Sequence, residues 1–128
     1  ASNYLSMITS GRYTNIYLDE VDGEKAIYIN GIDLDMPLDI SMNLSKGTLN
    51  QLYLALRLAI IEKLEDESTK LPIIFDELFV NWDEKRLEET LTLIKRISKD
   101  RQIIIFTCNP WMAEKFIGSL ETELISIE

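Results

Sequence analysis

Residues Ser45, Lys46 and Gly47 are the first candidates for chemistry, because they directly precede a run of apolar residues at helical spacing. A serine hydroxyl, free backbone N–H groups and the positive end of a helix dipole together suit a bound phosphate. The charge of Lys46 would attract that phosphate further. The competing interpretation is structural: Ser45 only caps the helix, and Gly47 only lets the chain turn tightly.

A second candidate is the pair Asp76 and Glu77, which ends the apolar run of residues 71–75. Acids at the carboxyl edge of a buried parallel strand lie where α/β folds bind ligands. One carboxylate can hold Mg²⁺ through water while its neighbour polarises an attacking water. The alternative is that both acids are simply solvated at the end of a strand.

A third candidate is the stretch Asn81-Trp82-Asp83, which follows shortly after Glu77. Asp83 is also a good N-cap for the helical pattern that follows, so a structural role alone would explain it.

Hydrophobic spacing indicates the elements that must position these residues. Residues 3–9 are typical of the last turns of a helix. Strand-like residues over 13–18, 25–29 and 32–36, separated by turn signals, predict a three-stranded antiparallel meander. From Ser45 we expect a helix of about five turns, most of it buried. Its apolar stripe comprises Leu49, Leu52, Leu56, Ala59, Ile60 and Leu64.

The second half of the chain alternates between strand and helix patterns. The apolar runs 71–75 and 102–106 predict buried strands, the first covered on both faces, and a last strand is expected over about 122–127. Asp83 and Asn109 predict the starts of two helices, the second ended by Gly118. The core face of the first comprises Leu87, Leu91, Ile94 and Ile97. The fold class is therefore α/β: an antiparallel meander followed by alternating helices and mostly parallel strands, in a single domain over 1–128.

The composition limits the partners that this chain can have. Thirteen basic residues against 22 acidic ones give a net charge of −9, with no histidine. This charge disfavours direct binding to DNA or to an anionic membrane. The single cysteine, Cys108, cannot form an internal disulfide, and no apolar run is long enough to span a bilayer. A cytoplasmic location is expected.

Four sequence stretches, taken in order, resemble the motifs of ABC ATPases of the SMC and RecN kind. LSKGTLNQLYLALRLA is similar to their signature motif and its helix, and LPIIFDE to their Walker B strand. LFVNWDEKR is similar to the D-loop, and RQIIIFTCN to the strand before the switch loop. The resemblance covers roughly residues 4–128 and is strongest to the large bacterial YhaN-type proteins, which carry long coiled coils. It implies the C-terminal lobe of an ATPase head, with the end of a coiled coil at about residues 1–10.

This resemblance implies a role for each matching residue. Ser45 and Gly47 would contact the terminal phosphate of ATP bound to an opposing head. Lys46 differs from the commonest signature text, and its charge could help an incoming phosphate. Asp76 would support Mg²⁺ on the chain's own nucleotide, and Glu77 would act as the general base. The residues implied at the dimer interface, or in coupling nucleotide state to lobe movement, are Asn81, Asp83 and Arg57. An arginine that shields the polar edge of its helix is the alternative for Arg57.

Two departures from the family pattern affect the expected activity. Asn109 stands where the family has its switch histidine; it can hydrogen-bond a phosphate but cannot carry a positive charge, and it can equally cap the next helix. The sequence also contains no G-x-x-x-x-G-K-[ST] loop, the element that wraps the ATP phosphates. In SMC-type proteins that loop belongs to an N-terminal lobe, so this lobe alone should not bind ATP tightly.

The sequence therefore predicts half of an ATP-hydrolysing head. Its expected partners are an N-terminal Walker A lobe of the same protein, a second head in a homodimer, and DNA indirectly through the assembled protein. DNA repair or chromosome maintenance is the expected setting. Two alternatives stay open: a non-hydrolysing module in which ATP only gates dimerisation, and a dimerisation domain that uses no nucleotide.

Overall fold

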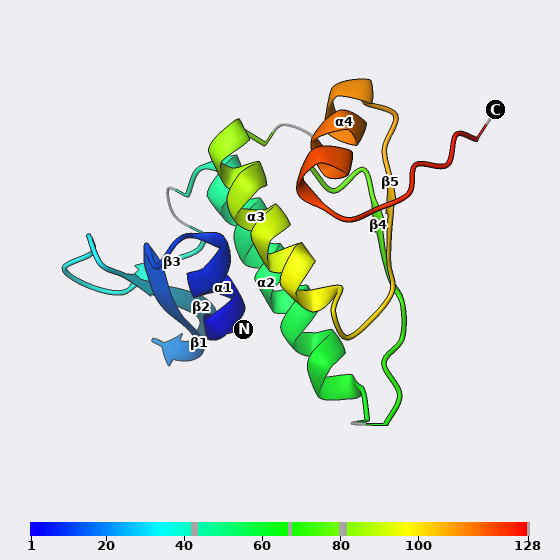
Figure 1. Cartoon of the computed structure of the whole chain (residues 1–128). Coiled ribbons are helices and arrows are strands. Elements are labelled where there is room, and N and C mark those ends of the chain that lie inside the picture. The colour runs from blue at the N-terminus through cyan, green and yellow to red at the C-terminus, as the bar shows by residue number, and fades with distance from the viewer. Residues whose placement is uncertain (42–43, 67, 80–81, 128) are drawn as a thin grey trace.

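The computed structural model describes residues 1–41, 44–66, 68–79 and 82–127. Helices α2 and α3 lie side by side through the middle of the molecule, and their packing separates two small sheets (Figure 1). Within the described ranges the elements are α1 (Ser2–Ile8), β1 (Tyr13–Val21), β2 (Glu24–Gly31), β3 (Leu38–Asp39), α2 (Lys46–Leu64), β4 (Ile73–Asp76), α3 (Glu84–Ile97), β5 (Ile103–Phe106) and α4 (Pro110–Ser119). This arrangement confirms the predicted α/β fold. None of the helices in these ranges is long and apolar enough to cross a bilayer.

The three-stranded antiparallel sheet has the predicted order β1-β2-β3. Asp22 and Gly23 join β1 to β2 with φ angles of 55° and 82°, as a two-residue hairpin requires. The predicted position of the third strand was wrong. Residues 32–36 form a turn held by the N–H of Leu34, which donates to the Gly31 carbonyl at 3.2 Å, and the strand is residues 38–39 instead. The alternating aspartates reflected an exposed loop, not a strand face.

Helix α2 has the predicted start and length, but a different face is buried. Of the six residues in the predicted stripe only Leu52 belongs to the buried set, and the side chains of Ile60 and Leu64 are 57% and 81% exposed. The helix carries apolar residues on almost every side, so spacing alone could not choose its face. The choice is made by α1, since buried Gln51 donates to the Ile8 carbonyl at the end of that helix. The buried residues are Thr48, Gln51, Leu52, Leu54, Ala55 and Leu58.

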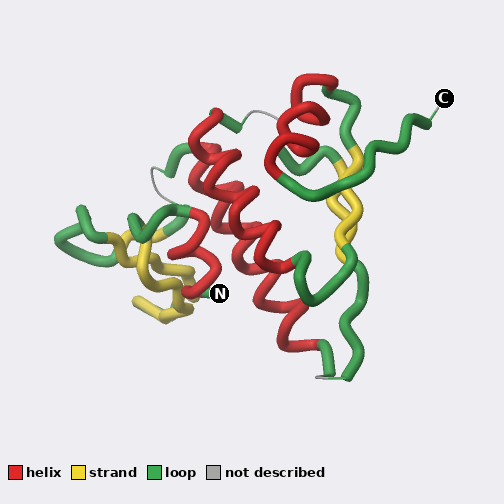
Figure 2. The backbone as a smooth tube through the Cα atoms, viewed as in Figure 1, coloured by secondary structure: helices red, strands yellow, loops and turns green. Residues whose placement is uncertain are grey.

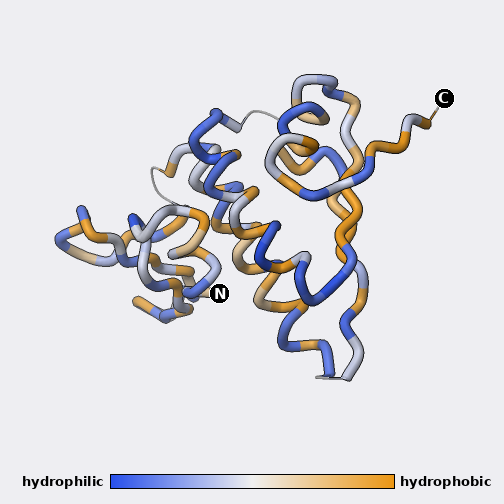
Figure 3. Tube along the Cα trace, viewed as in Figure 1, coloured by the Kyte–Doolittle hydropathy of each residue, from blue (hydrophilic) through white to orange (hydrophobic). Residues whose placement is uncertain are grey.

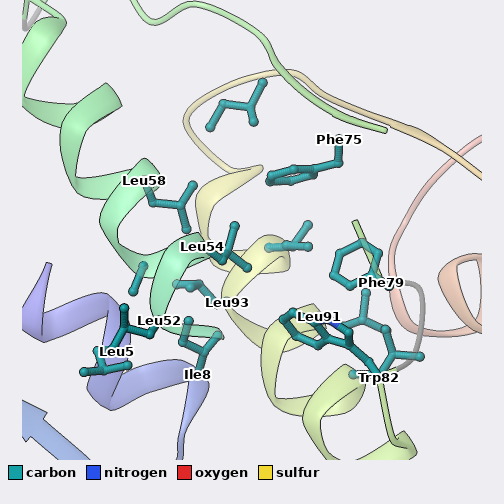
Figure 4. Close-up of a cluster of buried hydrophobic side chains, with 14 of the residues drawn as sticks. Leu5, Ile8, Leu52, Leu54, Leu58, Phe75, Phe79, Trp82, Leu91 and Leu93 are labelled. Atoms are coloured by element: carbon teal, nitrogen blue, oxygen red, sulfur yellow. The ribbon is translucent and has the colours of Figure 1, made fainter. Parts of the chain in front are cut away.

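The central core lies between α2, α3 and β4 (Figure 4). In Figure 4 Leu93 of α3 lies near Leu52 and Leu54 of α2, Leu91 lies near Trp82, and Phe75 of β4 belongs to the same cluster. The predicted core face of α3 is confirmed for Leu87, Leu91 and Ile94, while Ile97 is half-buried. Figure 2 shows how these two long helices dominate the middle of the fold.

Strands β4 and β5 are parallel, as predicted, and Asp76 is aligned with Phe106 at their carboxyl ends. The expectation that the first of them is covered on both faces was wrong: Ile73 and Phe75 are buried, whereas Ile74 between them is 61% exposed. Helices cover one side of the pair, and in Figure 3 the strands stand out as a strongly apolar segment. The last predicted strand was also wrong, because residues 121–127 form no regular structure and expose Leu124, Ile125 and Ile127.

Side-chain caps fix the starts of the two later helices. The Asp83 carboxylate accepts the Arg86 N–H at 3.0 Å at the start of α3. The Asn109 carboxamide oxygen accepts the N–H groups of Trp111 and Met112 at 3.0 and 3.4 Å at the start of α4. Both caps were predicted. Gly118 lies inside α4, which continues to Ser119, so the predicted end of that helix was one residue early.

A buried ion pair connects the end of α2 to the beginnings of β4 and β5. The Arg101 guanidinium donates two hydrogen bonds, of 2.7 and 2.5 Å, to the Glu65 carboxylate, and only 6% and 7% of these two side chains is exposed. The Leu71 N–H donates to the same carboxylate at 3.1 Å. The hydrogen bond from Arg101 is the main cause that holds the pKa of Glu65 below its ordinary value.

We expect Glu65→Gln to lower the melting temperature by several degrees at pH 7, because Arg101 loses its charged partner. The folded-state pKa of Glu65 is depressed, so its contribution is present above the unfolded pKa of about 4.3 and is lost as the pH falls through the folded value. Calorimetry over pH 2–7 should show the two proteins converging in acid. The control is Glu123→Gln in the exposed tail; an equal loss in both variants would contradict this role.

We expect Asn109→Ala to lower the free energy of unfolding by about 1 kcal/mol, since two N–H groups of α4 lose their acceptor. Asn109→Asp keeps an acceptor oxygen at the helix start and should retain most of the stability. Urea unfolding monitored by tryptophan fluorescence measures both variants. Equal losses for alanine and aspartate would show that the cap does not stabilise the helix.

Candidate functional site

The predicted site residues fall into two clusters that face the same end of the molecule. The starts of α2 and α3 and the carboxyl ends of β4 and β5 all lie toward the upper end of Figure 1. We call the first the tip cluster, which comprises Ser45, Gly47, Asp83 and Arg86. We call the second the strand-end cluster, which comprises Asp76, Glu77, Cys108 and Asn109.

Ser45 is an exposed N-cap whose hydroxyl has several partners. Its Oγ accepts the Thr48 N–H at 3.2 Å and lies 2.9 Å from the Thr48 hydroxyl. Lys46 is the exposed first residue of α2. The helix therefore presents its free N–H end and one positive charge to the surface, as the phosphate interpretation requires. The structural interpretation of Ser45 as a cap is equally satisfied by this geometry.

Gly47 does not serve a tight turn, which was the structural alternative for this residue. It is the second residue of α2 and lies within the helix. A Cβ atom built on Gly47 would lie 3.0 Å from Cζ of Arg86 and 3.1 Å from its Nε and Nη1. The glycine therefore makes room for the arginine, which approaches from the start of α3.

Arg86 is the residue of the tip cluster that sequence reasoning missed. Its Nη1 pairs with the Asp83 carboxylate, and its Nη2 donates to Ser45 Oγ at 3.4 Å. The signal was available, because a basic residue three positions after a capping aspartate lies on the same side of the helix. The backbone N–H of Arg86, and after it the guanidinium, hold the pKa of Asp83 below its ordinary value.

The strand-end cluster is organised around Glu77. Its φ of 47° is left-handed, a conformation that costs a residue with a Cβ of the order of 1 kcal/mol. The Glu77 N–H donates to the Phe106 carbonyl at 3.1 Å, and its carboxylate accepts the Cys108 N–H. The hydrogen bond and charge of Glu77 raise the pKa of the Cys108 thiol. Glu77 is therefore fixed to the loop that leads to Asn109.

Asp76 and Asn109 flank this carboxylate. Asp76 is exposed at the last position of β4. A hollow of about 240 Å³ lies beside Glu77, between the ends of the two strands and the start of α4. Its lining residues are Glu77, Phe79, Trp82, Phe106, Thr107, Asn109, Trp111 and Met112. The oxygen of Asn109 is occupied by its cap, so only its amide N–H groups can donate to a ligand.

The remaining predicted residues have no shared contact with these clusters. Arg57 is exposed in the middle of α2, and no hydrogen bond or ion pair of the described residues involves it. Asn81 lies outside the described residues. In the ranges that the structure covers, no three acidic, cysteine or histidine side chains gather as a complete metal site. The tip and strand-end clusters are likewise not joined by a hydrogen bond within those ranges.

Comparison with known proteins shows where this architecture occurs. No protein-family model matches the chain. The uncharacterized protein YhaN of Bacillus subtilis (strain 168) is 33% identical over 127 residues, which are 98% of this chain and 13% of YhaN. The chain thus spans only a small part of that relative.

Solved structures of SMC ATPases share the fold. One, from work on ATP-driven dimerisation and DNA-stimulated activation of SMC ATPases, has a TM-score of 0.62 and 21% identity, covering 88% of this chain and 69% of that one. Another is the Smc head domain of Pyrococcus furiosus with an extended coiled coil, bound to the C-terminal domain of ScpA. It matches with a TM-score of 0.62 and 21% identity, covering 88% of this chain and 28% of that one. In sequence the chain is similar to one segment of YhaN, and in structure it shares the fold of SMC ATPase head domains.

Proposed function

We propose that this chain supplies half of an ATP site in a head that dimerises around ATP and hydrolyses it. The observation that carries the proposal is the placement of the Ser45–Gly47 tip, with Ser45 and Lys46 exposed, and of the strand-end acids at one end of the fold (Figure 1). In a head-to-head dimer, each tip would contact the terminal phosphate on the opposing head. The strand-end cluster would act on the chain's own nucleotide.

Within this proposal the strand-end residues divide the chemistry. The exposed carboxylate of Asp76 suits Mg²⁺, which is usually held by one or two carboxylates together with water and substrate phosphates rather than by a full protein cage. Mg²⁺ would neutralise charge on the phosphates. Glu77, whose position is fixed by Phe106 and Cys108, would orient and deprotonate the attacking water. Asn109 would donate an amide N–H to a phosphate oxygen.

The uncovered side of β4 and β5 supports a second lobe as partner. Parallel sheets are normally buried on both faces, yet Ile74 and Phe106 are 61% and 43% exposed here. An N-terminal lobe that carries the Walker A loop would cover this apolar surface and bring the phosphate-binding loop to the strand ends. The same assembled protein would supply the positive surface for DNA, which a chain of net charge −9 lacks. The proposed setting is DNA repair or chromosome maintenance.

One observation favours a second candidate function, in which ATP gates dimerisation without turnover. Asn109 stands where the family resemblance places a switch histidine, and its side-chain oxygen caps α4. An uncharged amide stabilises a developing negative charge less than a cation does. An ATP-dependent dimer that releases no phosphate would support this alternative, whereas steady phosphate release supports the ATPase.

The contact between Glu77 and Cys108 can be tested on the chain itself. The hydrogen bond and charge of Glu77 raise the thiol pKa, so we expect Glu77→Gln to move the pH midpoint of Cys108 alkylation downward. Stopped-flow alkylation with iodoacetamide between pH 7 and 10 measures that midpoint. Glu114→Gln on α4 is the control, and an unchanged midpoint in Glu77→Gln would place Glu77 away from the thiol.

In the full-length protein we expect Glu77→Gln to reduce ATP turnover by roughly 10²- to 10⁴-fold, as loss of a general base does. ATP-dependent dimerisation should persist, since the variant keeps the tip cluster intact. Phosphate release and analytical ultracentrifugation measure the two properties. Glu88→Gln, an exposed acid of α3, is the matched control. Unchanged turnover in Glu77→Gln would remove Glu77 from the role of base.

A further inference from the structure

We propose that Arg86 is a positioning residue that holds the Ser45–Gly47 tip in place against the start of α3. The inference rests on the proposed function, because the tip matters only if it meets a nucleotide on another head. Its own basis is a set of contacts that the family resemblance did not assign. Arg86, at the start of α3, contacts Ser45, at the start of α2, which lies 41 residues earlier in the sequence.

The first step is that Arg86 is anchored at both ends of its guanidinium. Nη1 pairs with Asp83 Oδ2, and Nη2 donates to Ser45 Oγ at 3.4 Å. Asp83 is itself fixed, because its other oxygen accepts the Arg86 backbone N–H at 3.0 Å. The planar guanidinium has donors in a rigid fork, so it can serve two acceptors at once. A lysine ammonium at this position would carry all its donors on one nitrogen and would lack the fork whose two nitrogens reach Asp83 and Ser45.

Gly47 of α2 lies against the guanidinium of Arg86. Gly47 is helical, and glycine disfavours a helix interior relative to alanine. No tight turn explains it, whereas a Cβ there would press on Cζ, Nε and Nη1 of Arg86 at 3.0 to 3.1 Å. The glycine and the arginine therefore fit each other, independently of the two polar contacts. Any shift of α3 relative to α2 at this end must disturb the hydrogen bond to Ser45 and the fit against Gly47, whereas the pair with Asp83 lies within α3 and would persist.

Arg86 fixes the orientation in which the Ser45–Gly47 tip would be presented to an opposing head. Ser45 Oγ also accepts the Thr48 N–H, so Arg86 acts on an atom that already belongs to the helix cap. With Arg86 in place, the hydroxyl and the free N–H groups have one orientation. Without it, the tip and Asp83 would move separately, and the surface presented to a terminal phosphate would be less well ordered.

The test uses the full-length protein in a Glu77→Gln background, so that ATP is not consumed. We expect Arg86→Ala to weaken ATP-dependent dimerisation about tenfold, with Arg86→Lys intermediate because it keeps only one of the two contacts. Binding of ATP to the monomer and the melting temperature should stay unchanged, which a merely structural role would not allow. The matched control is Lys85→Ala, which removes an exposed positive charge from the same turn.

The possible outcomes separate the two proposals. If the Arg86→Ala protein dimerises as tightly as its parent, the inference is wrong while the proposed function stands. If the parent itself forms no ATP-dependent dimer, the proposed function fails, and the inference is decided by amide chemical shifts of the chain. Arg86→Ala should then shift the Ser45 and Gly47 amide signals while Lys85→Ala leaves them in place. Unshifted signals in Arg86→Ala would overturn the inference.

Discussion

The packing of α2 against α3 is the constraint on which the other parts of this structure depend. Leu52 and Leu54 of α2 lie near Leu93 of α3 in that core, and Phe75 is added from β4. Because the two helices are fixed along their length, their starts are fixed as well. The tip cluster lies at those starts, so burial in the core sets the geometry of groups that are themselves exposed. A substitution that changes the core packing is therefore expected to change the geometry of the tip cluster as well.

Local signals in the sequence predicted the parts of the fold that local chemistry decides. Ser45, Asp83 and Asn109 each cap a helix as expected, because a side-chain oxygen next to free N–H groups needs no distant partner. The hairpin at Asp22-Gly23 formed for a similar reason. Asp76 and Glu77 mark the end of β4 as predicted, because an abrupt change from apolar to charged residues is typical of the end of a strand.

Distant packing decided what the sequence could not predict. The buried face of α2 depends on α1, which offers the Ile8 carbonyl to Gln51, and no spacing rule contains that contact. Whether the second face of β4 is covered, and whether residues 121–127 form a strand, depends on the segments that pack beside them, which local sequence patterns do not reveal. Arg86 was missed because its second contact, Ser45, comes from another helix. Only the contact with Asp83 could have been inferred locally.

The parallel pair β4–β5 has a consequence for how this chain behaves outside a larger assembly. A pair of strands with only one face covered presents both apolar side chains and unsatisfied edge groups to water. Such a surface favours pairing with an exposed strand of another molecule, including an identical one. The strong negative charge opposes this by mutual repulsion. Raising the salt concentration screens that repulsion, so self-association of the chain is expected to increase with ionic strength.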